Sequence, residues 1–224
     1  NLAREGNRDE AQAWFQKAAD KGERVAMCNL GIYADEDGDL AAAREWWERS
    51  AEAGYAPAMY YLAELAQEAG DRDSEQTWLE QAAELGHKNA MLRLGRLAKD
   101  SGNQELARSW FTRAADAGSV DALARLGILA SMEGNRTEAR ALYEKAAEQG
   151  HIVAQYNLGV LAGKDGDLAV ARDWYQRAAE AGHTDAMNNL GVLANEDGDS
   201  AAARDWCQRA AEAGHAGAMN NLGV

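Results

Sequence analysis

The sequence repeats with a period of 32 residues, and no other feature limits its possible folds as strongly. Three series of glycines follow this spacing. They run Gly6, Gly38, Gly70, Gly102, Gly134, Gly166, Gly198; Gly22, Gly54, Gly86, Gly118, Gly150, Gly182, Gly214; and Gly31, Gly95, Gly127, Gly159, Gly191, Gly223, with Ala63 in the second place of the last series. A fixed period of roughly 20 to 50 residues indicates a solenoid, in which each repeat contacts only its neighbours. The 224 residues correspond to about seven such repeats.

Each repeat predicts a first and a second helix joined by short turns. In residues 24–55, apolar side chains recur at helical spacing, and Gly38 provides the left-handed residue that ends the first helix. Asp39 is a good N-cap for a second helix, which Gly54 ends. The N-cap position holds Asn7, Asp39, Asp71, Asn103, Asn135, Asp167 and Asp199. Strand patterns are absent from the sequence, so we expect an all-α array of fourteen helices.

Two further repeated positions predict how the helices pack. Leu-Gly pairs such as Leu30-Gly31 let the first helix press against the second at the glycine. A tryptophan position on the second helix holds Trp14, Trp46, Trp78, Trp110, Trp174 and Trp206, with Leu142 as the substitute. We expect these side chains to fill the seam between successive repeats. A stacking ladder for bases or sugars is the alternative interpretation.

Composition and charge exclude several classes of function. A net charge of −14 argues against nucleic acid as a partner, because such binding depends on Lys and Arg at phosphates. No apolar run approaches the roughly 18 to 20 residues that span a membrane, so we expect no membrane partner. Cys28 and Cys207 lie more than five repeats apart and cannot form a disulfide with each other, which favours a reducing, cytoplasmic location. The abundance of Arg, Ala and Gly is typical of a GC-rich bacterial genome.

The titratable residues do not predict a catalytic or metal site. His87, His151, His183 and His215 share one repeated position, whereas metal ligands must converge on a common point. The acidic loops at 35–39 and 196–199 lack the ligand alternation of a calcium loop and end in helix N-caps. No nucleophile constellation or phosphate-binding loop is present. We therefore expect no metal, no cofactor and no enzymatic activity in this segment.

The repeat resembles the Sel1-like repeat, a relative of the tetratricopeptide repeat. The match lies in Ala-Met-Asn-Asn-Leu-Gly at 186–191, Gly198-Asp199, Ala203, Trp206 and the segment 209–215. The resemblance implies a right-handed α-solenoid that serves as a non-enzymatic scaffold or adaptor. In such arrays the first helices line a concave groove that binds a protein or an extended peptide. The bare Gly-Asp turn between the helices is shorter than in most Sel1-like repeats, which leaves the superhelical pitch open.

The position before the repeated leucine is predicted to face this groove. It holds Asn29, Tyr61, Arg93, Arg125, Asn157, Asn189 and Asn221. In tetratricopeptide domains, an Asn or Arg at the corresponding place contacts bound peptide, and an Asn amide can pair with a peptide backbone. The alternative is that these amides bond within the scaffold.

Charge adds one candidate anchor. Residues 88–119 carry six Lys or Arg and three Asp or Glu, and this is the only repeat with a positive balance. Arg96 lies one helical turn from Arg93, and Arg125 follows in the next repeat. These arginines predict an anchor for an acidic group, because guanidinium binds carboxylate bidentately. Charge scattered over a solvated helix is the alternative.

Two functional hypotheses follow. The first is a scaffold that binds a protein or peptide in the groove. The second is a sensor or oligomerisation segment of a larger signalling enzyme, such as a nucleotide-hydrolysing regulatory protein. The chain does not begin with Met and it ends inside a helix-forming stretch, so we expect residues 1–224 to form a single array within a longer protein. Its open ends also predict self-association.

Overall fold

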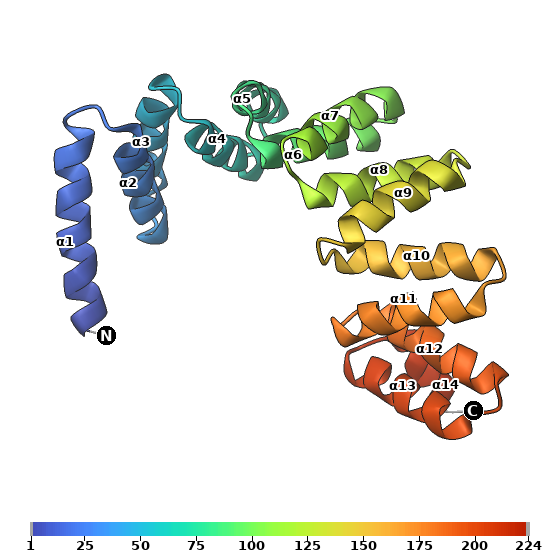
Figure 1. Cartoon of the computed structure of the whole chain (residues 1–224). Helices are drawn as coiled ribbons and strands as arrows, with labels where there is room; N and C mark the ends of the chain where they lie inside the picture. Colours follow the sequence, from blue (N-terminus) through green and yellow to red (C-terminus); the bar gives the residue numbers. More distant parts are fainter. Residues whose placement is uncertain (1, 223–224) are drawn as a thin grey trace. The chain divides into compact units, whose positions relative to one another are not determined.

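The computed structural model describes the backbone of residues 2–222 and the side chains of residues 7–220. This part of the chain is all-helical, with fourteen helices joined by short turns (Figure 1). Their bounds are α1 Leu2–Ala19, α2 Arg24–Glu36, α3 Leu40–Glu52, α4 Ala56–Glu68, α5 Arg72–Glu84, α6 Lys88–Asp100, α7 Gln104–Asp116, α8 Val120–Met132, α9 Arg136–Ala147, α10 Ile152–Lys164, α11 Leu168–Glu180, α12 Thr184–Glu196, α13 Ser200–Glu212 and α14 Ala216–Leu222. The predicted all-α solenoid is confirmed.

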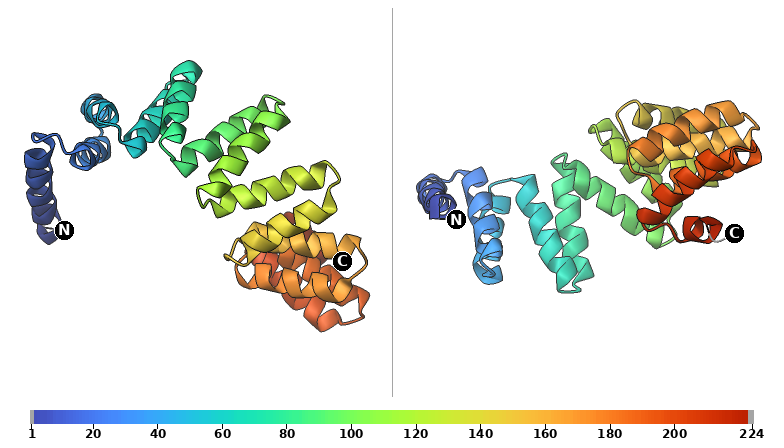
Figure 2. Two further views of the ribbon diagram at one scale, coloured as in Figure 1. Left: turned by 45° about the horizontal axis from the view of Figure 1, so that its top comes forward. Right: turned by 90° about the horizontal axis from the view of Figure 1, so that it is seen from below.

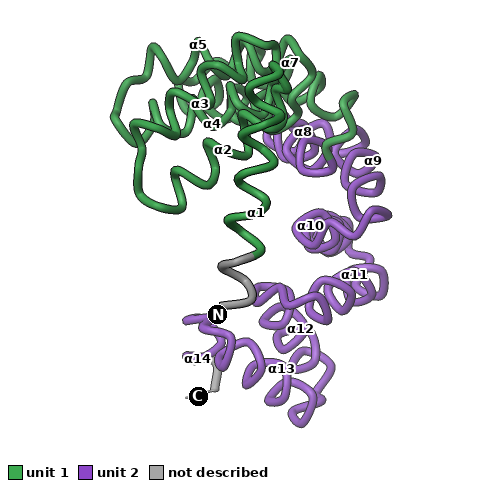
Figure 3. The backbone as a smooth tube through the Cα atoms, turned by 90° about the vertical axis from the view of Figure 1, so that its left-hand side faces the viewer, with its two compact units in different colours: residues 1–119 green, residues 120–224 purple. Residues whose placement is uncertain are grey.

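The helices form two compact units (Figure 3). Unit 1 covers residues 1–119 with helices α1–α7, and unit 2 covers residues 120–224 with helices α8–α14. Within each unit, a first helix packs most extensively on the second helix that follows it, and that second helix packs on the next first helix (Figure 2). Within each unit, each repeat thus contacts its neighbours in sequence, as expected for a solenoid.

Left-handed glycines close the turns at both ends of the repeat. Gly38 has a φ of +81° and Gly54 a φ of +76°, values that side chains other than glycine rarely adopt. At the first turn, the Asp39 N–H donates to the Ala34 carbonyl at 2.8 Å, which pairs a carbonyl that the helix end leaves open. The six predicted N-caps from Asp39 to Asp199 are confirmed. Each accepts a backbone N–H from the residue three positions on, as in the 3.0 Å bond from Ala42 to Asp39.

The predicted turn at Gly6 and N-cap at Asn7 are wrong. Helix α1 continues through both positions from Leu2 to Ala19.

The close approach of the two helices at glycine is confirmed. An added Cβ on Gly95 would lie 2.5 Å from Cδ1 of Phe111, and real Cβ atoms essentially never come within 3.0 Å of a non-bonded atom. The same contact joins Gly31 to Trp47, Gly127 to Tyr143, Gly159 to Tyr175 and Gly191 to Cys207. Ala63, the exception in the series, has the smaller Leu79 at the matching position, and both are fully buried. The large side chain and the missing Cβ thus set the spacing within each repeat.

The tryptophan position fills the seam between repeats, as predicted. Trp174 on α11 packs on a core that includes Ala147 of α9 and Leu158 of α10. Trp206, one repeat later, and Trp46, four repeats earlier, pack on equivalent cores. Trp14 lies on the first described helix and is 62% exposed. The guanidinium groups of Arg49, Arg113, Arg177 and Arg209 each lie 4.1 to 4.6 Å from the ring of the tryptophan three residues before.

Candidate functional site

The predicted binding position lies on the first helices, where its residues differ in burial. Asn29, Tyr61, Arg125, Asn157 and Asn189 are half-buried, and Arg96 is exposed. Arg93 is only 5% exposed. The side chain of Asn221 lies outside the described residues. The exposure of the side chain at this position therefore varies from repeat to repeat.

The asparagines separate into two kinds. Asn189 hydrogen-bonds with the hydroxyls of Tyr156 and Tyr175. Burial raises the pKa of both tyrosines, and the bond with Asn189 opposes that rise. Asn29 and Asn157, by contrast, have no side-chain hydrogen bond with any other described residue. The amide of Asn189 is engaged within the scaffold, while those of Asn29 and Asn157 retain their pairing capacity.

Tyr61 takes part in an aromatic stack. Its ring lies 4.9 Å from that of Trp47 at an interplanar angle of 12°. Burial raises the pKa of Tyr61, and nearby groups that include Cys28 and Glu64 add to the rise. Burial also raises the pKa of Glu64, although the positive charge of Arg93 opposes that change. Half-buried aromatic and acidic groups thus lie close together on α4.

Arg93 forms a buried ion pair. Its Nη2 lies 2.8 Å from Oε1 of Glu75, and its Nε donates to the same oxygen at 2.9 Å. Nη2 also bonds to Oε1 of Gln67. An acidic ligand at Arg93 would have to compete with Glu75 for the guanidinium. Sequence reasoning missed this pair, although its signal is present: Glu75 occupies a position that is alanine in neighbouring repeats, as at Ala43 and Ala107.

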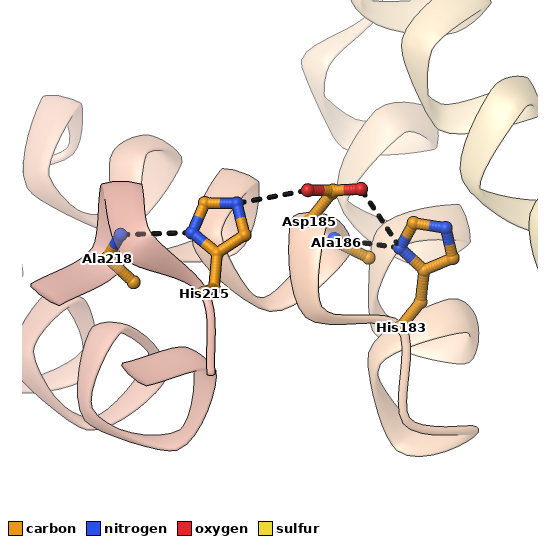
Figure 4. Close-up of polar contacts among 5 residues, drawn as sticks. All are labelled: His183, Asp185, Ala186, His215 and Ala218. Atoms are coloured by element: carbon orange, nitrogen blue, oxygen red, sulfur yellow. Dashed lines mark hydrogen bonds and ion pairs between the residues drawn. The ribbon is translucent and has the colours of Figure 1, made fainter. Parts of the chain in front are cut away.

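The four histidines are N-caps of first helices, which sequence reasoning also missed. Nδ1 of His183 accepts the backbone N–H of Ala186 at 3.4 Å, and Nδ1 of His215 accepts that of Ala218 at 3.0 Å (Figure 4). His87 and His151 make the same bond, at 3.3 and 3.1 Å. Glu23 occupies the same repeated position before α2, and its carboxylate accepts the Ala26 N–H at 2.8 Å. A cap-forming side chain at this position was the feature of the sequence that could have predicted the histidine caps.

The outer nitrogens of two histidines bond to a carboxylate one repeat earlier. Nε2 of His215 lies 3.0 Å from Oδ1 of Asp185 (Figure 4). Nε2 of His151 lies at the same distance, 3.0 Å, from Oδ1 of Asp121. An Nδ1 that accepts a hydrogen bond leaves the proton of a neutral imidazole on Nε2. The two bonds therefore join successive repeats.

The other two histidines stack on tyrosines. The rings of His183 and Tyr156 lie 4.4 Å apart at 12°, and those of His87 and Tyr60 lie 4.9 Å apart at 35°. Burial lowers the pKa of His87. Burial also lowers the pKa of His183, and the charge of Asp185 opposes that shift.

Acidic loops make ion pairs between repeats. Nη2 of Arg140 lies 2.6 Å from Asp165, and Nη2 of Arg8 lies 2.9 Å from Asp37. Among the described residues, no three His, Cys, Asp or Glu side chains are placed to hold a metal ion. In the same part of the chain, no helix combines the length and apolar character that a membrane span requires.

Comparison with protein families decides the identity of the repeat. The Sel1 repeat matches residues 3–23, 56–87, 89–119, 120–151 and 152–183, which is more than half of the chain. The chain belongs to the Sel1 repeat family. Two segments of this Sel1 repeat protein, residues 24–49 and 181–218, match tetratricopeptide repeats. The predicted resemblance to both kinds of repeat is confirmed.

Solved structures share the fold. A Sel1 repeat protein from Oxalobacter formigenes is 24% identical, with a TM-score of 0.78 over 95% of this chain and 97% of that one. The protective antigen c5321 of uropathogenic Escherichia coli is 25% identical, with a TM-score of 0.52 over 94% of this chain and 58% of that one. YrrB, a tetratricopeptide protein with an unusual peptide-binding site, is 20% identical, with a TM-score of 0.52 over 76% of this chain and 93% of that one. No curated protein matches this Sel1 repeat chain by sequence. The fold is typical of protein-interaction scaffolds.

Proposed function

We propose that this Sel1 repeat chain is a non-enzymatic scaffold that binds a protein or an extended peptide through the side chains of its first helices. The observation that carries the proposal is the state of Asn29 and Asn157. Both amides are half-buried at the same repeated position, and neither is hydrogen-bonded to another described side chain. A fixed amide with free donors and acceptors can pair with the N–H and C=O of an extended peptide.

Other residues of the position would contribute in different ways. Tyr61 is held by its stack on Trp47 and offers a hydroxyl and a ring edge. Arg96 in unit 1 is exposed and is a candidate anchor for acidic groups, and Arg125 in unit 2 is a separate, half-buried candidate. Arg93 would have a structural role beneath the exposed residues of α6, since its charge is paired with Glu75. Asn221 would extend the position into α14.

The test is capture of partners by the full chain, followed by variants. The double variant Asn29→Ala/Asn157→Ala should lose the captured protein and keep wild-type helical content, because neither amide bonds within the scaffold. Gln176→Ala is the matched control: Gln176 is exposed on a second helix and bonds to Glu180 of the same helix. If the double variant retains the same partner with unchanged affinity, these asparagines do not form the binding surface.

A further inference from the structure

Two opposite charges interrupt an apolar position on the first helices. The residue after the repeated glycine, or after Ala63 in the one exception, is Ile or Val in five of the seven repeats. The full series is Ile32, Glu64, Arg96, Ile128, Val160, Val192 and Val224. Glu64 on α4 and Arg96 on α6 thus lie on successive first helices of unit 1. The charged pair occurs in that unit alone.

The two charges do not stabilise the scaffold in the way that Arg93 and Glu75 do. Arg96 is exposed and makes no ion pair with any other described residue. Glu64 is half-buried and accepts the hydroxyl of Tyr60 on its own helix, but no Lys or Arg pairs with it in the described part of the chain. The nearby guanidinium of Arg93 is already held by Glu75. The charges of Glu64 and Arg96 therefore remain available to a partner.

The surroundings of Glu64 favour a cation. Burial raises the pKa of its carboxyl, and the charges of Glu68 and of Asp35 on α2 add to that rise. Tyr61, one helical turn before Glu64, stacks one face of its ring on Trp47, and no described cation lies over the ring. A Lys or Arg side chain at Glu64 would reduce the repulsion between the carboxylates and would lay its aliphatic stem along the tyrosine ring.

The surroundings of Arg96 favour an acid. Helix α6 carries four Lys or Arg residues and one acidic residue, Asp100, whereas α4 carries two Glu and no Lys or Arg. The guanidinium of Arg96 is exposed, and such a group binds a carboxylate with two parallel hydrogen bonds. Successive first helices of unit 1 thus present a negative and then a positive side chain at the same position.

We propose that Glu64 and Arg96 set the direction and register of the bound partner, an extended segment with a basic side chain opposite Glu64 and an acidic side chain opposite Arg96. This inference rests on the proposed binding of a peptide by the first helices and adds the charge pattern of that peptide. A segment that is reversed, or shifted by one repeat, would place like charges against each other.

Short peptides of defined charge test the pattern directly. Each carries two charged residues separated by two to five Gly or Ser residues, which span about 10 to 20 Å when extended. Peptides with Lys and Glu, with two Lys and with two Glu are compared at equal spacing. NMR titration of the full chain at low ionic strength follows the backbone amides of α4 and α6. We expect the Lys–Glu peptide to bind about threefold more tightly than the other two, because only it satisfies both charges. Equal affinities would overturn the proposal.

Charge reversal should change this preference. Glu64→Arg should prefer the peptide with two Glu, and Arg96→Glu the peptide with two Lys. Glu45→Arg is the matched control, because Glu45 is exposed on α3 and the net charge changes by the same amount; this variant should keep the wild-type preference. Glu64→Gln adds no new charge and keeps an acceptor for Tyr60, so it preserves the local structure. It should lose about threefold in affinity for the Lys–Glu peptide.

Two results would refute the role of the charged pair. Either Glu64→Arg keeps the wild-type preference, or Glu64→Gln binds the Lys–Glu peptide as tightly as the wild-type chain. Both results differ from a failure of the proposed function, which the capture experiment with Asn29→Ala/Asn157→Ala tests separately.

Discussion

The contact between Gly95 and Phe111 allows a direct test of what sets the spacing within a repeat. In Gly95→Ala the new Cβ would lie 2.5 Å from Cδ1 and 3.0 Å from Cζ of Phe111. The ring is almost fully buried and cannot move aside. Such overpacking costs about 1 to 3 kcal/mol, which the better helix propensity of alanine reduces by about 0.5 to 1 kcal/mol. We expect a net loss of about 1 to 2 kcal/mol in the free energy of unfolding.

The compensating change is taken from the chain itself, where Ala63 and Leu79 occupy the matching positions. Phe111→Leu alone should cost about 2 kcal/mol, because three carbon atoms leave the core. In the double variant Gly95→Ala/Phe111→Leu the alanine fills part of that space. The loss should therefore be smaller than the sum of the single losses by at least about 1 kcal/mol.

Urea denaturation followed by far-ultraviolet circular dichroism measures all three variants. Gly163→Ala is the control, because its Cβ would meet nothing nearer than 3.9 Å. It should be neutral or should stabilise the protein by about 0.5 to 1 kcal/mol. Strictly additive losses in the double variant would refute the argument that the ring and the glycine determine each other.

Three more predictions use the same denaturation assay. Gln155→Met should raise the free energy of unfolding by about 1 to 3 kcal/mol, because the buried Oε1 of Gln155 has no hydrogen-bond partner; Gln155→Glu, which keeps an unpaired group there, should not. Arg93→Ala should cost about 3 to 5 kcal/mol because it leaves Glu75 buried without a counter-charge, and the added change Glu75→Ala should recover most of that loss. Trp174→Ala should cost about 3 kcal/mol as its packed seam empties, whereas Trp14→Ala should cost under about 1 kcal/mol; equal losses would contradict the seam interpretation.

Much of the fold was predictable because each repeat presents the same local signals. Glycine at Gly38 and Gly54 has one physical reason to recur, the left-handed turn, and Asp39 has one, the N-cap. The period carries these signals through the chain. The fold class therefore required no knowledge of contacts between distant residues.

The properties of the predicted binding position were harder to predict, because the burial and hydrogen bonds of its residues depend on side chains of other helices, which the local pattern does not include. Arg93 was expected to be an accessible cation, yet it pairs with Glu75 on the preceding helix. Each residue differs from the type most common at its repeated position, and the two differences compensate each other because their charges pair. Ala63 and Leu79 form a second such pair. An unusual residue at a repeated position thus predicts a contact only when it is considered together with an unusual residue on the neighbouring helix.

The histidine caps were missed for a related reason. The sequence shows that His151 recurs, but the acceptor role of Nδ1 depends on a backbone N–H whose position only the folded turn defines. Ala154, three residues on, is alanine in every repeat and gives no polar signal.

The short sequence separation of the hydrogen bonds between repeats has a consequence for folding during synthesis. Asp121 and His151 are only thirty residues apart, as are Asp185 and His215. Contacts of such short sequence separation need little loop closure before they form. Each repeat can therefore complete its junction soon after it leaves the ribosome, before the remainder of the chain has been synthesised. Synthesis from the N-terminus would build the array in order, with few apolar seams open at any time.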